Sequence, residues 1–255
     1  MLNQATVDRL RQLRLTGMAD AFQAQMENPF QYQELSFEER FGLLVDQEWS
    51  WREDRRVRRQ LKEAKLRLTA CMENIDFRVS RGLDRGQVMS LAGCDWVRKH
   101  RHVLITGATG TGKTFLGCAL ANAACRQGFS SRYWRLSRLL AEMAAARVDG
   151  TYNRLLGQLS RVDVLVLDDW GLAALTHPQG LDVMEVIEER NERRSNVVVS
   201  QLPLEHWHAA LPDPTVADAI LDRLIHNAYK FALHAVGDSM RKLYASFNQD
   251  DPGEG

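Results

Sequence analysis

The stretch GATGTGKT at residues 107–114 has the residue types and the spacing of a loop that binds phosphate groups. Its glycines can adopt backbone conformations that other residues avoid, so successive N–H groups can turn inward around an anion. Lys113 would supply positive charge to the β and γ phosphate oxygens, and the Thr114 hydroxyl can bind Mg²⁺. The candidate nucleotide-binding residues are Gly107, Ala108, Thr109, Gly110, Thr111, Gly112, Lys113 and Thr114. The spacing therefore predicts a site for a nucleoside triphosphate.

The residues on either side of this loop predict the strand and the helix that would hold it. An apolar run at 102–106 predicts a strand, and an amphipathic pattern over 113–127, ending before Gly128, predicts a helix. The N–H groups at the start of such a helix, together with its dipole, would point toward bound phosphates. A glycine turn before an ordinary amphipathic helix is the alternative, but the eight-residue match in a strand–loop–helix setting favours the phosphate site.

Two adjacent carboxylates follow a second apolar strand. The sequence VDVLVLDDWG predicts a buried strand over 162–167 that delivers Asp168 and Asp169 at its carboxyl end, where ligands bind in open α/β sheets. We expect Asp168 to bind Mg²⁺, directly or through water, and Asp169 to polarise the attacking water. A further strand over 196–200 ends beside Gln201, whose polar side chain could reach the γ-phosphate or its water.

Short apolar or β-branched segments alternate with helical patterns through the C-terminal part of the chain. The predicted strands are 102–106, 132–136, 162–167 and 196–200, and the predicted helices are 113–127, 137–147 and 178–194. This alternation is typical of an α/β fold in which a parallel sheet is flanked by helices on both faces.

The N-terminal region predicts a small all-α domain that precedes the sheet. An amphipathic helical pattern that includes Val7 is interrupted near Gly17. Ser36 and Glu39 then have the spacing of a capping box that opens a long helix reaching to about Leu68. We therefore place a helical DNA- or partner-binding domain at 1–68, an ATPase domain at 69–248 and a disordered polar tail at 249–255.

The composition excludes several classes of protein. The 255 residues contain 33 basic and 33 acidic side chains, so affinity for nucleic acid would have to come from a local patch. No apolar run approaches the length of a membrane span and the N-terminus lacks a signal-peptide core, so we expect no membrane association and a cytoplasmic location. The cysteines lack metal-binding spacing, which predicts reduced thiols; they are Cys71, Cys94, Cys118 and Cys125.

A local cationic patch lies in the predicted long helix. Residues 51–67 carry eight basic and three acidic side chains, a net charge of +5, beside Trp49 and Trp51. Basic residues on successive helical turns suit contacts with DNA phosphates that do not read the bases, although a solvated helix face has the same composition. The candidate DNA-binding residues, which we call the basic stripe, are Arg52, Arg55, Arg56, Arg58, Arg59, Lys62 and Lys65.

The order of motifs along the chain resembles a known family. GATGTGKT, LVLDDWG, VVVSQLP, AILDRLIH and GDSMR follow one another as in the AAA+ P-loop ATPases of the DnaC/IstB clade. The N-terminal LRLTGMADAFQAQ resembles the helical domain of the IstB-like transposition helpers in that clade, so the resemblance covers nearly the whole chain. It implies an ATPase that converts ATP and water to ADP and phosphate with Mg²⁺.

The resemblance also implies roles for individual residues. Residues 107–114 match the Walker A loop, and Asp168 and Asp169 match the Walker B pair. Most AAA+ enzymes have glutamate at the position of Asp169, so we expect slow turnover. The implied catalytic residues are Lys113, Asp169, Gln201, Arg223 and Arg241.

The last three of these residues differ in how well they match. Gln201 falls where the family has the asparagine called sensor 1, which leaves its water-positioning role open. Arg223 matches the arginine finger that reaches a neighbouring subunit's nucleotide, and Arg241 matches sensor 2. Both would stabilise the γ-phosphate as it leaves. A finger that acts on a neighbour implies that the active unit is an oligomer.

For function, the resemblance implies a helper ATPase that oligomerises on duplex DNA with weak sequence selectivity and assists a transposase. Two alternatives remain open. One is a DnaC-like replicative helicase loader that holds the helicase with its N-terminal helices, and the other is a nucleotide-gated DNA scaffold in which hydrolysis is incidental. The family-like N-terminal segment favours the helper.

Overall fold

The computed structural model describes residues 2–78 and 81–235, and this part of the chain divides into two compact units. The first unit ends at Arg59 and the second begins at Gln60. The division falls inside one long helix, α3 (Phe37–Ala64). The domain boundary at 68/69 that the sequence suggested stays a prediction, and the predicted tail at 249–255 lies outside the described residues.

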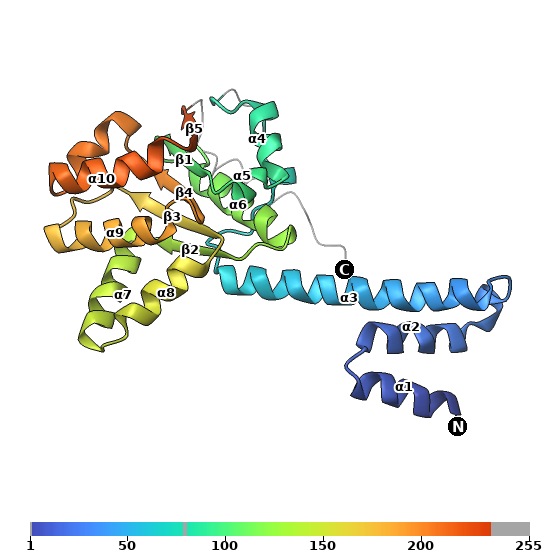
Figure 1. Ribbon diagram of the computed structural model, residues 1–255. Helices are drawn as coiled ribbons and strands as arrows, with labels where there is room; N and C mark the ends of the chain where they lie inside the picture. Colours follow the sequence, from blue (N-terminus) through green and yellow to red (C-terminus); the bar gives the residue numbers. More distant parts are fainter. Residues whose placement is uncertain (1, 79–80, 236–255) are drawn as a thin grey trace, which may run out of the picture. The chain divides into compact units, whose positions relative to one another are not determined.

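The first unit consists of α1 (Leu2–Gln12), α2 (Thr16–Glu27), the 3-10 helix η1 (Pro29–Tyr32) and the first part of α3 (Figure 1). The predicted capping box opens α3: the Ser36 N–H donates to Glu39 Oε2 over 2.7 Å, and the Glu39 N–H donates to Ser36 Oγ over 3.2 Å. The interruption expected near Gly17 comes slightly earlier, between α1 and α2, where Arg14 has a φ of 60°. Gly17 itself lies inside α2, where a Cβ would stand 2.7 Å from the Gln47 carbonyl oxygen of α3. Its role is therefore close helix packing.

The second unit is built on a parallel five-stranded sheet with the order β2-β3-β4-β1-β5. The strands are β1 (His102–Gly107), β2 (Ser131–Arg135), β3 (Val164–Trp170), β4 (Ser195–Ser200) and β5 (Ala228–Leu233). The four strands predicted from the sequence are confirmed as β1 to β4, with bounds that differ from the predicted ones by a few residues at most. The fifth, β5, was not predicted, because its sequence AYKFAL carries a charged residue and no run of β-branched side chains.

Helices cover both faces of this sheet, as predicted. The helices of the second unit beyond α3 are α4 (Arg85–Ala92), α5 (Asp95–Arg98), α6 (Lys113–Arg126), α7 (Leu136–Val148), α8 (Tyr152–Arg161), α9 (His177–Arg190) and α10 (Pro214–Ile225). Short 3-10 helices are η2 (Met72–Asn74), η3 (Leu204–His206) and η4 (His208–Ala210). Figure 1 shows α6 on one side of the sheet and α9 and α10 on the other.

Alternation along the buried strands creates the two cores between these layers. In β1, Val103 and Ile105 pack in the core that contains α6, whereas Leu104 packs in the core that contains α7, α9 and α10. The same division recurs in β3 and β4, because successive side chains of a strand point to opposite faces. Strands buried on both faces explain the near-continuous apolar runs that identified them in the sequence.

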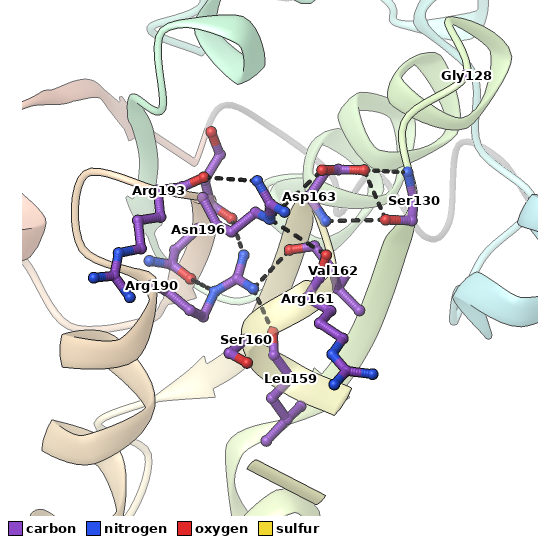
Figure 2. Close-up of polar contacts among 12 residues, drawn as sticks. Gly128, Ser130, Leu159, Ser160, Arg161, Val162, Asp163, Arg190, Arg193 and Asn196 are labelled. Carbon is purple, nitrogen blue, oxygen red and sulfur yellow. Dashed lines mark hydrogen bonds and ion pairs between the residues drawn. The ribbon is translucent and has the colours of Figure 1, made fainter. Parts of the chain in front are cut away.

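A buried arginine lies at the amino ends of the strands, whereas the glycine-rich loop follows the carboxyl end of β1. Arg190, at the end of α9, is fully buried and donates to Asn196 Oδ1 over 2.7 Å and to the carbonyl oxygens of Leu159, Val162 and Ser195 (Figure 2). Burial, and the nearby charge of Arg194, lower its pKa to about 9. One guanidinium thus satisfies acceptors from α8, the segment before β3 and the start of β4.

The four cysteines are free thiols, as expected, and Cys94, Cys118 and Cys125 are buried. Within the described ranges, no helix is both long enough and apolar enough to cross a membrane.

Candidate nucleotide-binding site

The glycine-rich loop lies between β1 and α6, where the sequence placed it. Gly107 has a φ of 143° and Gly112, just before α6, has a φ of 92°, both in the region that favours glycine. At Gly107 a Cβ would also stand 2.2 Å from the Leu233 carbonyl oxygen of β5, so no larger residue fits. The loop therefore leads directly into the N-terminus of α6, whose first N–H groups can face an anion.

Internal hydrogen bonds hold the loop in shape. Lys113 is largely buried, and its Nζ donates to the Ala108 carbonyl oxygen over 2.6 Å. Thr111 Oγ1 donates to the same carbonyl oxygen over 2.9 Å. Arg81, which is also buried, donates from Nη1 to the Thr111 carbonyl oxygen over 3.1 Å and from Nη2 to the Asp76 carbonyl oxygen over 3.0 Å. The segment before α4, which gave no clear prediction from sequence, thus stabilises the loop through a hydrogen bond from Arg81.

Asp168 lies at the end of β3 and faces the start of α6. Its Oδ2 accepts hydrogen bonds from Thr114 Oγ1 over 3.1 Å and from the Tyr133 hydroxyl over 2.6 Å. Arg67 Nη1 lies 3.5 Å from the same oxygen. Burial, and then the hydrogen bond to Asp168, raise the pKa of Tyr133, so this hydroxyl remains a donor. Thr114 and Asp168, the two predicted metal ligands, are therefore in contact.

Asp169 occupies an irregular position in the same strand. Its φ is 61°, and the register between β3 and β4 shifts between Leu167 and Trp170. A bulge of this kind re-aims a side chain. The Asp169 carboxylate lies 3.7 Å from Nε of Arg135, the last residue of β2, and it is partly exposed to the cavity. Asp168 and Asp169 thus line the same cavity but have different partners, Asp168 with Thr114 and Tyr133 and Asp169 with Arg135.

Gln201 follows β4 and contacts the loop directly. Thr109 Oγ1 donates to Gln201 Oε1 over 2.8 Å. The structure therefore brings Gln201 to the phosphate loop.

These groups line one cavity of about 740 Å³, within the usual range for a small-molecule site. Lys113, Thr114, Asp168, Asp169 and Gln201 all contribute to its walls. The donor set fits a magnesium ion, because a hydroxyl and a carboxylate are hard oxygen ligands of the kind that Mg²⁺ prefers. The arrangement can hold a triphosphate with its metal and leaves a carboxylate beside it for water.

The chain that forms this site is similar in sequence to ATP-binding proteins of insertion sequences. The model of the IstB-like ATP binding protein family matches residues 8–246. An insertion sequence ATP-binding protein of Sinorhizobium fredii, y4pL, is 46% identical over 242 residues, which cover 95% of this chain and 98% of that protein. The ATP-binding protein of insertion sequence IS1162 from Pseudomonas fluorescens is 48% identical over 204 residues, 80% of this chain and 88% of that protein. The chain belongs to the IstB-like family.

Solved structures show the fold that this IstB-like protein shares. The crystal structure of DnaI matches with a TM-score of 0.56 at 22% identity, covering 72% of this chain and 93% of that chain. The DnaC helicase loader matches with a TM-score of 0.57 at 18% identity, covering 67% of this chain and 99% of that chain. The AAA+ P-loop fold expected from the sequence is confirmed.

Of the two arginines expected to act on the γ-phosphate, Arg223 lies within the part of this IstB-like chain that the structure describes. Arg223, on α10, pairs with Glu188 of α9 and donates from Nη1 to the Ala219 carbonyl oxygen over 2.7 Å. This position is apart from the residues that line the cavity of its own subunit. Arg241 lies outside the described residues.

The basic stripe is exposed on α3 and just beyond it. Several of its members pair with acidic residues of the same helix: Arg52 with Glu48 over 2.6 Å, Arg56 with Glu53 over 2.6 Å and Arg58 with Asp54 over 3.6 Å. Arg55 stacks over the Trp51 ring, 5.2 Å from its centroid. The stripe extends across the division between the two units, with Lys62 and Lys65 in the second. Its DNA contacts stay a prediction.

Residues that the sequence did not assign to the site also line it or support it. Tyr133 and Arg135 are two apart on β2, which places both side chains on the same face, and Arg135 is in register with Asp168. That periodicity is visible in SRYWR, but its meaning depends on β2 lying beside β3, which the sequence does not state. Arg67 was counted in the cationic patch of residues 51–67, yet its side chain reaches Asp168.

Proposed function

We propose that this IstB-like protein is a Mg²⁺-dependent ATPase that assembles on duplex DNA in its ATP-bound form and assists a transposase in insertion-sequence transposition. The observation that carries the proposal is the meeting of Lys113, Thr114, Asp168 and Asp169 around one cavity. Relatives named as insertion sequence ATP-binding proteins, similar over nearly the whole chain, support the biological setting.

We propose a role for each of these residues, and its position supports that role. Mg²⁺, when bound by Thr114 and Asp168, would neutralise charge on the β and γ phosphates. Lys113 exchanges its internal contact with Ala108 for the phosphate oxygens, and the N-terminus of α6 adds its N–H groups. Asp169 accepts a proton or a hydrogen bond from the attacking water. Gln201, already bonded to Thr109, orients that water or the γ-phosphate.

The proposal includes an oligomer, because Arg223 belongs to a neighbour's site in this account. Its guanidinium pairs with Glu188 in its own subunit and is not among the residues that line the cavity of that subunit. In a head-to-tail assembly the same side chain would reach the next subunit's γ-phosphate and stabilise its developing charge. Arg241, for which we propose the sensor 2 role, would act on the nucleotide of its own subunit.

A replicative helicase loader is the first alternative. DnaI and the DnaC helicase loader share the fold at 22% and 18% identity and cover 72% and 67% of this chain, so they support the AAA+ core alone. The insertion-sequence relative y4pL is 46% identical and covers 95% of the chain. This difference favours the transposition helper, and binding of purified transposase or of replicative helicase to the ATP-bound protein would separate the two.

For DNA binding, we expect cooperative, largely sequence-independent duplex binding with a slowly hydrolysed ATP analogue and much weaker binding with ADP. A protomer offers few phosphate contacts, whereas an assembly links many copies and raises the effective affinity without new contacts. Changing Arg55, Arg56, Arg58 and Arg59 to glutamine should weaken DNA binding. It should also make the slope of the log of the DNA-binding constant against log salt concentration less steep, by ~0.9 for each DNA phosphate that the variant no longer neutralises. Binding isotherms over a salt series measure both effects.

A matched variant removes the same charge from the same unit but away from the stripe. It changes the exposed residues Arg9, Arg11, Arg14 and Arg40 to glutamine. We expect this control to keep the wild-type salt slope and both variants to bind ATP normally without DNA. Equal slopes in the wild type and the stripe variant would show that the stripe is only a solvated helix face and that DNA contacts lie elsewhere.

A further inference from the structure

Arg67 is a cation of the nucleotide cavity that belongs to none of the motifs. It follows α3 by three residues, and Lys65, with a φ of 50°, turns the chain there. Leu66 packs against the core of the α6 face. These contacts within the second unit fix the backbone next to Arg67, which lines the cavity together with Lys113 and Thr114.

The Arg67 guanidinium stands beside the predicted metal-binding carboxylate. Its Nη1 lies 3.5 Å from Asp168 Oδ2, the oxygen that also accepts from Thr114 and Tyr133. Although burial acts to lower it, the pKa of Arg67 is raised by Tyr133 and by the carboxylates of Asp168 and Asp169. The side chain is about one third exposed, and it contributes to the wall of the cavity. Arg67 is thus a positive charge held next to the carboxylate that would bind the metal, in the cavity proposed for the triphosphate.

We propose that Arg67 binds the triphosphate as a second protein cation beside Lys113, and that its charge opposes Mg²⁺ at Asp168. The inference rests on the proposed nucleotide site. A positive charge attracts a bare triphosphate, but it repels a divalent cation that shares the same carboxylate. Arg67 therefore substitutes in part for Mg²⁺, and it lowers the extent to which nucleotide binding depends on the metal.

This arrangement makes a prediction that a purely structural role for Arg67 does not make. Replacing Arg67 by glutamine should weaken binding of an ATP analogue in EDTA by roughly tenfold, and should weaken binding with Mg²⁺ much less. The gain in affinity produced by Mg²⁺ should then be about 5–10-fold larger in the variant than in the wild type, which is the size of a moderate coupling between two sites. The four dissociation constants of a thermodynamic cycle give this factor: those of the wild type and of Arg67→Gln, each with Mg²⁺ and with EDTA. They are measured with a fluorescently labelled ATP analogue.

Two variants serve as controls for the cycle. Arg67→Lys keeps the charge and should keep the wild-type Mg²⁺ dependence of nucleotide binding. It also tests the proposal if Arg67→Gln folds poorly. Loss of the wild-type Mg²⁺ dependence in Arg67→Lys would contradict the proposal that the charge at this position sets it. Tyr133→Phe removes a neutral donor from the same oxygen, Asp168 Oδ2, and should change the affinities with and without Mg²⁺ by similar factors.

The outcomes separate this inference from the proposed function. If the wild type binds no nucleotide, the proposed function fails. If the wild type binds nucleotide but Arg67→Gln changes both affinities by the same factor, or weakens the Mg²⁺-loaded complex more, the nucleotide site stands and Arg67 only neutralises Asp168.

Discussion

Replacing Asp169 by asparagine is expected to reduce ATP hydrolysis by roughly 10²–10⁴-fold, because a positioned general base contributes that much. ATP binding should remain close to that of the wild type, since Asp168 and Thr114, the residues that would hold Mg²⁺, are unchanged. The backbone should survive as well, because asparagine tolerates the positive φ of 61° at this position better than most residues. Phosphate release at saturating ATP, together with the nucleotide dissociation constant, measures the two effects.

A control for this variant is Asp95→Asn, which removes an exposed carboxylate of α5 that pairs with Arg98. Its hydrolysis should match that of the wild type. Wild-type turnover in Asp169→Asn would show that another group polarises the water. Full transposition activity without hydrolysis in Asp169→Asn would instead support the nucleotide-gated scaffold.

Replacing Arg190 by methionine is expected to lower the free energy of unfolding by about 3–5 kcal/mol, because it leaves several buried acceptors without a donor. These acceptors are Asn196 Oδ1 and the carbonyl oxygens of Leu159, Val162 and Ser195. For a domain of this size the loss corresponds to a fall in Tm of about 10 °C. Thermal unfolding followed by circular dichroism measures it.

Arg194→Met is the matched variant for that test. Arg194 is four residues away, is partly exposed, and lies 3.6 Å from Asp163 Oδ1. A surface ion pair of this kind contributes at most about 1 kcal/mol. Similar losses in the two variants would contradict the role assigned to the buried guanidinium.

Much of the fold and of the site could be predicted from sequence because the signals are local. The motif at 107–114 specifies a loop and the helix that follows it, and the alternation of apolar runs with helical patterns specifies a parallel sheet. Asp168 and Asp169 were identified because carboxylates at the end of a buried strand adjoin ligands in this architecture. The structure then shows Asp168 in contact with Thr114 across 54 residues of sequence.

The remaining features depend on contacts that no local pattern records. Arg67 and Tyr133 reach Asp168 only because β2 lies next to β3 and the chain turns at Lys65. Arg190 was not predicted to be buried, because an arginine at the end of a helix usually faces solvent. The contacts of Arg67 and Tyr133 depend on strand order and on a single turn, whereas the burial of Arg190 depends on carbonyl groups of α8, of the segment before β3 and of the start of β4 meeting at the end of α9.

The most direct test of the proposed function is ATP hydrolysis by a mixture of two inactive variants. Lys113→Ala should lose nucleotide binding, because the β and γ phosphates lack their cation, and Arg223→Ala should bind ATP but hydrolyse it poorly. Mixing them should restore hydrolysis where an intact loop meets an intact finger, which is about one quarter of the interfaces in a randomly mixed head-to-tail assembly. We expect this recovery in co-assembled samples. Wild-type hydrolysis by Lys113→Ala alone would contradict the proposed nucleotide site. No recovery at any mixing ratio, despite confirmed co-assembly, would contradict the action of Arg223 on a neighbouring subunit's nucleotide.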